Sequence, residues 1–312
     1  MRNDWTRGEV KEIFSLPLFE LIFSAATVHR ENHNPEKIKS SVLISVRTGA
    51  CSEDCAYCAQ SSRYKTSVNP EKLSSVKEIV DQAIEAKEKG VSRVCLSTSG
   101  TRVVPNKDFE MILEAGRQIR TLGLDVCCTM GMAKKEEIES LKNAGFSAYN
   151  HNIDTSERFY PSIITTRKFS ERIETINAII EGGMSVCSGG IIGMGETEDD
   201  RIDFLHTLAT LPVHPFSVPL NMLVPVSGTP LESYKPISSF EMVRMIACAR
   251  ILMPQSNICL AAGRSTLSNE AQALCYLAGA NSIFGGDKLL TTPNMGDELD
   301  NRLFELLNLK KV

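Results

Sequence analysis

Ser41-Val-Leu-Ile-Ser-Val46 is the first of eight short runs rich in β-branched residues, and a longer charged stretch with helical periodicity follows each one. The other runs are Ser92–Ser97, Asp125–Met130, Ala148–Ile153, Met184–Ile192, Ser217–Leu223, Asn257–Ala262 and Asn281–Phe284. The helical patterns lie near residues 74–89, 107–122, 134–144, 169–182, 198–210, 238–252, 268–279 and 297–309. Eight strands alternating with eight helices predict an α/β fold, a (β/α)8 barrel of the TIM type. Counting elements leaves a doubly wound open sheet as the alternative.

The segment before the first strand has a different pattern. Residues 8–30 carry a rough helical stripe of apolar side chains and predict a leading helix. Neither an internal repeat nor a long Pro/Gly/Ser linker divides the remainder. We therefore predict an N-terminal helical extension over residues 1–40 and a single barrel domain over residues 41–312. Parallel strands would gather the chemistry at their carboxyl ends.

The composition is that of an ordinary globular protein, with 42% hydrophobic and 23% charged residues. A net charge of −4, from 34 basic and 38 acidic residues, argues against nucleic acid or an anionic membrane as the partner. No apolar run reaches the roughly 18 residues of a membrane helix, and the polar start lacks a signal sequence, so we expect a cytoplasmic protein. In that reducing compartment, ten cysteines indicate metal or redox chemistry.

Three of these cysteines follow the first strand in the segment Thr48-Gly-Ala-Cys-Ser-Glu-Asp-Cys-Ala-Tyr-Cys-Ala-Gln60. Cys51, Cys55 and Cys58 can converge on one soft metal centre. Zinc or a closed ferredoxin-type cluster would need a fourth ligand nearby, and no further cysteine or histidine follows until Cys95. The spacing therefore predicts a 4Fe-4S cluster with one iron free to bind another molecule.

This motif, with Tyr57 before its last cysteine, resembles the radical S-adenosylmethionine superfamily. The resemblance implies a radical SAM core in which S-adenosyl-L-methionine binds the open iron and is cleaved there. The cofactor supplies the radical chemistry, and the protein positions it.

Three more cysteines, Cys95, Cys127 and Cys187, fall within the second, third and fifth predicted strands. In a closed barrel these strands would direct thiolates into one interior volume, which predicts a second iron–sulfur site. The third strand also contains Cys128. If Cys127 faces inward with Asp125 and Thr129, Cys128 belongs to an apolar set that faces the helices. The opposite register would bury Asp125 among the helices, which is costlier, so we predict that Cys127 faces inward.

The fourth strand places Asn150, Asn152 and Asp154 on one face by its two-residue period. These polar groups need partners, and a bound polar ligand would supply them. His151, on the other face, is interpreted as a packing histidine. The run Gly189–Thr197 after the fifth strand would let the backbone approach a flat ligand.

Several segments together resemble the biotin synthase family from about Phe14 to Leu306. They are Tyr149–Ser156, Val186–Thr197, Leu220–Leu231, Ala261–Arg264 and Ala278–Pro293. The resemblance implies a homodimer of barrels that inserts sulfur into dethiobiotin, the last step of biotin biosynthesis. It also implies reduced flavodoxin or ferredoxin as the electron donor, and iron–sulfur cluster assembly proteins as partners.

The same resemblance implies roles for individual residues. Cys95, Cys127, Cys187 and Arg264 would hold a 2Fe-2S cluster that supplies the sulfur, although arginine is an unusual ligand because it stays protonated. Asn152 and Asp154 would hold the ribose of the cofactor, and Asn150 and Asn221 the ureido ring of dethiobiotin. The adenine would lie against the pattern from Gly189 to Glu196, which includes Gly189, Ile191, Gly193 and Glu196.

One segment departs from the family. After Cys95 this chain has Leu96-Ser-Thr-Ser-Gly-Thr-Arg102, where the family usually has a Gly-Ala-Ala-Trp type segment, so the binding of the cofactor's methionyl end is open. Another radical S-adenosylmethionine enzyme remains an alternative, and so does an iron–sulfur electron-transfer protein. The electron carrier would have no use for the polar fourth strand.

Overall fold

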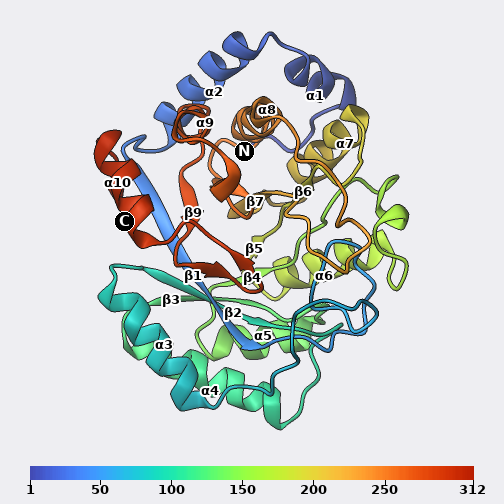
Figure 1. Ribbon diagram of the computed structural model, residues 1–312, viewed down its shortest axis with the longest axis vertical. Helices are drawn as coiled ribbons and strands as arrows, with labels where there is room; N and C mark the ends of the chain where they lie inside the picture. The colour runs from blue at the N-terminus through green and yellow to red at the C-terminus, as the bar shows by residue number, and fades with distance from the viewer.

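The computed structural model describes all 312 residues and forms a closed parallel barrel surrounded by helices (Figure 1). The wall closes because β1 pairs with β9 as well as with β2. This closure confirms the predicted (β/α)8 barrel and rules out the open sheet. The wall strands are β1 (Lys37–Arg47), β2 (Arg93–Thr98), β3 (Asp125–Thr129), β4 (Ala148–Asn150), β5 (Ser185–Cys187), β6 (Gly190–Ile192), β7 (Ser217–Met222), β8 (Asn257–Leu260) and β9 (Ser282–Phe284).

Eight helices cover the outside of the wall at the positions that the periodicity predicts. Capping boxes begin several of them: Ser75 with Glu78 starts α3, and Thr197 with Asp200 starts α7. The helices are α3 (Val76–Glu88), α4 (Lys107–Thr121), α5 (Lys135–Asn143), α6 (Phe169–Glu181), α7 (Glu198–Ala209), α8 (Ser239–Leu252), α9 (Asn269–Leu277) and α10 (Asp297–Leu306). Short pieces complete the chain: η1 (Tyr160–Ser162), η2 (Arg264–Thr266), β10 (Lys288–Leu289), β11 (Thr292–Pro293) and β12 (Lys310–Lys311).

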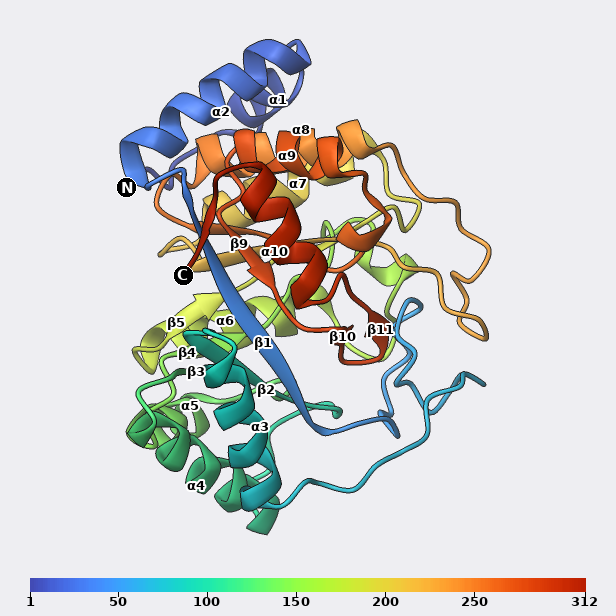
Figure 2. The ribbon, with the colours of Figure 1, turned by 60° about the vertical axis from the view of Figure 1, so that its left-hand side comes forward.

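The leading segment forms two helices where one was predicted, α1 (Arg7–Phe14) and α2 (Leu18–Asn32). Pro17 separates them because proline lacks the backbone N–H that helix α1 would need to continue, and it disfavours helical geometry at Leu16. Both helices pack on the outside of the barrel, α1 against α7 and α8 and α2 against α8 (Figure 2). No single helix is both long and apolar enough to cross a membrane; only the bent pair α1 and α2, taken together, meets that test.

The fifth predicted strand is interrupted between β5 and β6. A side chain at Gly189 would place its Cβ 2.0 Å from the carbonyl oxygen of Pro219, so only glycine allows the two backbones to approach this closely. The fourth strand also ends earlier than predicted, at Asn150, and Asp154 takes a positive φ of 68°. The strands at these positions therefore give way to irregular backbone beside the site.

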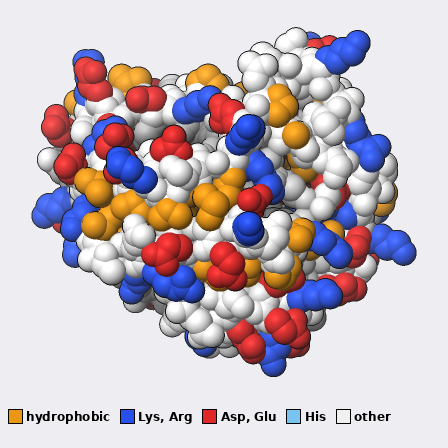
Figure 3. All heavy atoms as spheres, turned by 90° about the horizontal axis from the view of Figure 1, so that it is seen from below, with side chains coloured by type: hydrophobic (Ala, Val, Ile, Leu, Met, Phe, Trp, Pro, Cys, Tyr) orange, Lys and Arg blue, Asp and Glu red, His pale blue; other side chains and the backbone are white.

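The buried side chains form two separate groups. The larger cluster of 71 residues lies between the wall and the helices, and a small one of Cys95, Cys127, Ala148 and Cys187 lies inside the barrel. On the surface seen in Figure 3, acidic and basic side chains are interspersed around a band of hydrophobic ones. Three of the ten cysteines, Cys95, Cys127 and Cys187, therefore come together inside the barrel.

Candidate functional site

The loop after β1 brings Cys51, Cys55 and Cys58 to the carboxyl ends of the strands. The three line an upper cavity of about 220 Å³, together with residues from the ends of β2, β3 and β4. Backbone N–H groups of Thr165 and Thr166 donate to Asp54 at 2.9 and 3.1 Å and anchor this loop. Burial raises the pKa of Asp54, but these bonds outweigh it and bring the pKa to about 2. The loop is therefore fixed by an ionised carboxylate between its cysteines.

Two cysteine thiols of this loop, Cys55 and Cys58, resist ionisation on their own. Burial, with a contribution from the charge of Asp154, raises the pKa of Cys55 to about 12, and burial raises that of Cys58 to about 11. Thiolates at neutral pH would therefore need a positively charged partner, and iron ions supply that charge. The donor set fits the predicted cluster with three thiolates.

Three residues that line the same upper cavity each carry a buried polar atom without a hydrogen-bond partner. These atoms are Oδ1 of Asn150, Nε2 of His151 and Nε of Arg167. Buried polar groups are nearly always paired, so this concentration indicates a site for a polar ligand. His151 was interpreted as a packing histidine; instead it lines the cavity, because the strand alternation ends at Asn150.

Asp154 and Asn152, the predicted ribose ligands, both line this cavity and a neighbouring one of about 200 Å³. Asp154 is 3% exposed and accepts a bond of 2.7 Å from Nη2 of Arg172. Burial lowers the pKa of Arg172, but the carboxylate of Asp154 more than offsets this and raises it. Asn152 accepts a bond from the Gly189 N–H at 3.1 Å. Both side chains are thus held in place before any ligand binds.

The glycine-rich run contributes one residue to a cavity wall and several to loop structure. Ile191 lines the neighbouring cavity. The carboxylate of Glu196 is already occupied by hydrogen bonds within the protein. It accepts them from the backbone N–H groups of Gly193 and Met194 and from the side chain of Arg201, each at 2.8 Å. Glu196 therefore shapes the loop that carries the predicted adenine site, and Gly189 and Gly193 allow its close backbone turns.

The segment that departs from the family also lines the upper cavity. Ser97, Thr98 and Ser99 bring hydroxyl groups to its wall beside Gly100, where the resemblance implies a Gly-Ala-Ala-Trp type segment. Arg47 holds this segment by donating to the carbonyl oxygen of Ser99 at 2.9 Å. The cavity is therefore more polar on this side than the resemblance implies.

An inner cavity of about 400 Å³ lies deeper in the barrel, toward the amino ends of the strands. Cys95, Cys127 and Cys187 line it, as predicted, and Cys95 and Cys127 are neighbours in the β2–β3 register. Cys128 is absent from its wall and belongs instead to the large core under the helices. The predicted register of the third strand is confirmed.

The thiols of this inner cavity influence one another. The pKa of Cys127 lies well above its ordinary value. The interaction with Cys187 lowers this pKa, whereas the interaction with Cys95 and burial both raise it. Nowhere in the chain are three His, Cys, Asp or Glu side chains grouped as a single metal ion would require. A two-iron cluster distributes its ligands over two ions, so such an arrangement is not needed for it.

Arg264, the expected fourth ligand, does not line the inner cavity. Its guanidinium donates to both carboxylate oxygens of Asp300, at 2.5 and 2.6 Å, and to the carbonyl oxygen of Phe284 at 3.1 Å. Both side chains of this pair are fully buried, and only Nε of Arg264 lacks a partner. Withdrawing the arginine would leave a buried carboxylate unpaired, at a cost of roughly 3–5 kcal/mol.

Asn150 lies between the two cavities and lines both. Its Nδ2 donates to Thr129 Oγ1 at 3.0 Å, which leaves Oδ1 available. Asn221, the other predicted substrate ligand, lines the neighbouring cavity, but its amide already bonds the Gly190 carbonyl at 2.9 Å and the Ala262 N–H at 3.0 Å. The structure thus places Asn150 between the two cysteine sets.

Sequence reasoning missed several residues of these cavities. Cys259 on β8 and Arg93 on β2 line the inner one, and Arg167 and Arg172 line the upper one. The two-residue period of β8 was a usable signal for Cys259, because Ile258 and Leu260 are the apolar outward pair. Nothing local marks Arg167 and Arg172, since they reach the site through the tertiary fold.

Comparisons with known proteins agree with this geometry. The Radical SAM superfamily matches residues 45–208, and the Biotin and Thiamin Synthesis associated domain matches residues 219–310. A biotin synthase of Cytophaga hutchinsonii is 51% identical over 310 residues, which covers 99% of this chain and 92% of the relative. The mitochondrial biotin synthase of Arabidopsis thaliana is also 51% identical, over 99% of this chain and 82% of its own length.

Solved structures share the fold at lower identity. Methylornithine synthase superposes with a TM-score of 0.82 at 20% identity, covering 98% of this chain and 94% of its own. The FeFe-hydrogenase maturase HydG from Carboxydothermus hydrogenoformans gives 0.84 at 16% identity, covering 98% and 76%. At these identities the likeness establishes the barrel architecture alone.

Proposed function

This chain belongs to the biotin synthase family of the radical S-adenosylmethionine superfamily, and from that premise we propose which residues insert sulfur into dethiobiotin. It is a sulfurtransferase that uses a 4Fe-4S cluster, a 2Fe-2S cluster and S-adenosyl-L-methionine. The observation that carries the assignment of the site is the upper cavity. Three loop cysteines line it together with three residues that each carry an unpartnered buried polar atom.

When bound, S-adenosyl-L-methionine and the two clusters supply a hydrogen-abstracting radical and the sulfur atom that dethiobiotin gains. Cys51, Cys55 and Cys58 would hold the 4Fe-4S cluster, and Tyr57 would pack beside it. Cys95, Cys127 and Cys187 would hold the 2Fe-2S cluster in the inner cavity. The chain itself has to separate the two metal sites and place the substrate between them.

The upper cavity would bind the cofactor. Asn152 and Asp154 would receive the ribose hydroxyls, and Arg172 holds Asp154 in position through its hydrogen bond. Ile191 and the turns at Gly189 and Gly193, braced by Glu196, would contact the adenine. The unpartnered Nε of Arg167 is a donor suited to the cofactor's carboxylate.

Asn150 would position dethiobiotin between the two clusters. Its Oδ1 is an acceptor without a partner, and a ureido ring offers N–H donors. Asn221 would also contact the ureido ring from the neighbouring cavity, through an amide group that already bonds the Gly190 carbonyl. Binding there would place the substrate beside the one residue that lines both the upper and the inner cavity, Asn150.

Further parts of the proposal concern the protein's setting. Residues 41–312 would act as one barrel domain and residues 1–40 as an extension, although β1 already begins at Lys37. Ten free cysteines support a reducing compartment, and we propose the cytoplasm. Reduced flavodoxin or ferredoxin would supply electrons, cluster assembly proteins would rebuild the clusters, and the protein would act as a homodimer.

Cofactor cleavage tests the upper site. The reconstituted, reduced protein should convert S-adenosyl-L-methionine to methionine and 5′-deoxyadenosine under anaerobic conditions. Cys55→Ala should abolish this, because a cluster with three protein ligands has no thiolate to spare. Cys275→Ala, in a buried cysteine of α9 outside both cavities, should retain it. Formation of 5′-deoxyadenosine by Cys55→Ala would overturn the assignment, and an electron-transfer protein would form none in any variant.

A further inference from the structure

The ten cysteines of this chain divide into three groups by location. Three lie in the loop of the upper cavity, at Cys51, Cys55 and Cys58. Three belong to the apolar core between wall and helices, at Cys128, Cys248 and Cys275. The remaining four all line the inner cavity, and they are Cys95, Cys127, Cys187 and Cys259. The inner cavity therefore has one more thiol than the three that were predicted to hold its cluster.

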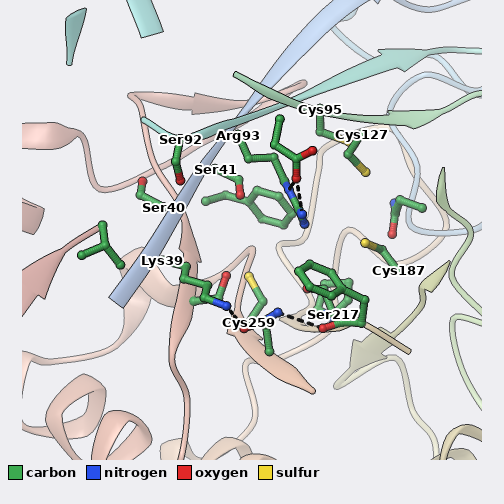
Figure 4. Close-up of a pocket in the computed structure, with 18 residues that line it drawn as sticks. Lys39, Ser40, Ser41, Ser92, Arg93, Cys95, Cys127, Cys187, Ser217 and Cys259 are labelled. Atoms are coloured by element: carbon green, nitrogen blue, oxygen red, sulfur yellow. Dashed lines mark hydrogen bonds and ion pairs between the residues drawn. The ribbon is translucent and has the colours of Figure 1, made fainter. Parts of the chain in front are cut away.

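Cys259 faces the inner cavity because of its position in β8. Its neighbours Ile258 and Leu260 belong to the core under the helices, so the alternation of the strand turns Cys259 inward. Its register partners, Pro219 on β7 and Ser282 on β9, line the same cavity. Figure 4 shows Cys259 across this space from Cys95, Cys127 and Cys187. The four thiols thus approach one volume from β2, β3, β5 and β8.

The surroundings of Cys259 suit a ligand better than a packing residue. The side chain is 1% exposed but belongs to neither apolar cluster. Thiolate sulfur is the usual protein ligand of iron–sulfur clusters. Arginine, by contrast, stays protonated and carries no readily available lone pair.

Arg264 is committed elsewhere, by its bidentate pair with the buried carboxylate of Asp300 on α10. It follows β8 after Gly263, whose positive φ of 84° turns the chain away from the strand direction. Its side chain is not part of the cavity wall. Arg264 therefore lies outside the cavity that the four thiols share.

We propose that Cys259 is the fourth protein ligand of the second cluster, so that four thiolates hold it and Arg264 holds none. This inference rests on the proposed function, which places a cluster in the inner cavity. Arg264 then has a structural role, as the partner that fixes α10 through Asp300. Complete thiolate coordination distinguishes this chain from the ligand set that its family resemblance implies.

The test needs the second cluster alone, in the full-length chain. The parent protein is the triple variant Cys51→Ala, Cys55→Ala, Cys58→Ala, which lacks the ligands of the first cluster. Each test variant adds one further substitution to this parent: Cys259→Ala, Cys259→Ser or Arg264→Lys. Cys128→Ala in the same parent is the matched control, because its thiol is as deeply buried as that of Cys259. After anaerobic reconstitution with iron and sulfide, bound iron, bound sulfide and visible absorption are measured. Circular dichroism records folding.

The parent and Cys128→Ala should each bind about two iron ions per chain with the absorption of a 2Fe-2S cluster. Arg264→Lys should bind the same amount, because lysine keeps the positive charge opposite Asp300. Cys259→Ala should lose at least half of the iron, and Cys259→Ser should shift the absorption, because oxygen replaces sulfur. A folded Cys259→Ala or Cys259→Ser protein with unchanged iron and spectrum would overturn the inference. A folded parent that binds no cluster would instead contradict the proposed function.

Discussion

Cys127 and Cys128 are chain neighbours whose side chains lie on opposite sides of the barrel wall. Cys127 lines the inner cavity and Cys128 packs in the core under the helices. Asp125 and Thr129 share the inward face, where Arg93 donates to the Asp125 carboxylate at 2.7 Å and Thr129 lies 4.0 Å from the sulfur of Cys95. A single residue of register therefore decides which thiol reaches the second cluster.

For this pair we predict opposite effects of the same substitution. Cys127→Ser should remove the 2Fe-2S absorption and biotin formation, because it deletes a thiolate from the cavity. Cys128→Ser should keep both, because that sulfur faces the helices. Visible spectra and single-turnover biotin yields of the two reconstituted variants provide the measurement. The reverse pattern would show that the register of β3 is wrong.

Asp154 supports a second prediction for a single residue. Asp154→Asn should weaken S-adenosyl-L-methionine binding at least tenfold, because a charge-assisted bond to a hydroxyl contributes roughly 1.5–3 kcal/mol, or about one to two decades of affinity. Equilibrium binding to the reconstituted protein is measured well below its unfolding temperature, since the variant also weakens the pair with Arg172. Asp81→Asn, at an exposed site on α3, is the control. An unchanged dissociation constant in Asp154→Asn would refute the ribose role.

At the scale of elements, periodicity was sufficient to predict the barrel and the positions of its helices. The eight runs and the eight helical patterns follow from side-chain alternation, which is encoded locally. The interruption between β5 and β6 was not predictable, because it arises where Gly189 meets Pro219 on a strand distant in sequence. The break at Pro17 had a local signal, since proline ends a helix that would otherwise continue.

The crossing at Gly189 leads to a stability prediction. Gly189→Ala should lower the free energy of unfolding by about 1–3 kcal/mol, because its Cβ would lie 2.0 Å from the Pro219 carbonyl oxygen and the backbone has to shift. Gly8→Ala, in α1, is the control: its Cβ would lie 3.9 Å from the nearest atom, and alanine favours a helix. Urea unfolding of the cluster-free proteins measures both. Equal stability of Gly189→Ala and the unmodified chain would show that the two backbones do not meet as described.

The docking of α2 on the barrel should depend on pH. Burial, followed by the charge of Arg250, lowers the pKa of His29 to about 3 and that of His33 to about 4. An unfolded histidine titrates near 6.5, so the unfolded chain binds more protons between about pH 6.5 and pH 4. Stability should therefore be fully present above about pH 6.5 and fall as the pH decreases through this window.

His33→Gln tests this origin of the pH dependence. Glutamine can still accept a hydrogen bond from Arg250, as His33 Nε2 does at 2.8 Å, but it does not titrate. The free energy of unfolding of the cluster-free variant should change less steeply between pH 6.5 and pH 4 than that of the unmodified protein. An identical pH slope for the two proteins would exclude His33 as a source.

At the scale of the whole molecule, the barrel separates two metal sites and leaves Asn150 between them. The sequence indicated both cysteine sets, because the loop triplet has a recognisable spacing and the other three cysteines fall within predicted strands of one barrel. It did not indicate that Arg264 is paired with Asp300, since that contact joins η2 to α10 across 36 positions. Nor did it show that His151 faces a cavity, because the irregular backbone after β4 ends the alternation on which that interpretation depended.

The central claim is that this barrel joins dethiobiotin to sulfur carried in its own inner cavity. The most direct measurement is a single turnover of the protein with its second cluster reconstituted from isotopically labelled sulfide, freed of excess sulfide, and supplied with S-adenosyl-L-methionine, an electron donor and dethiobiotin. The account predicts labelled biotin, at no more than about one equivalent per second cluster, and none from Cys127→Ser. Unlabelled biotin, or cofactor cleavage without any biotin, would contradict it.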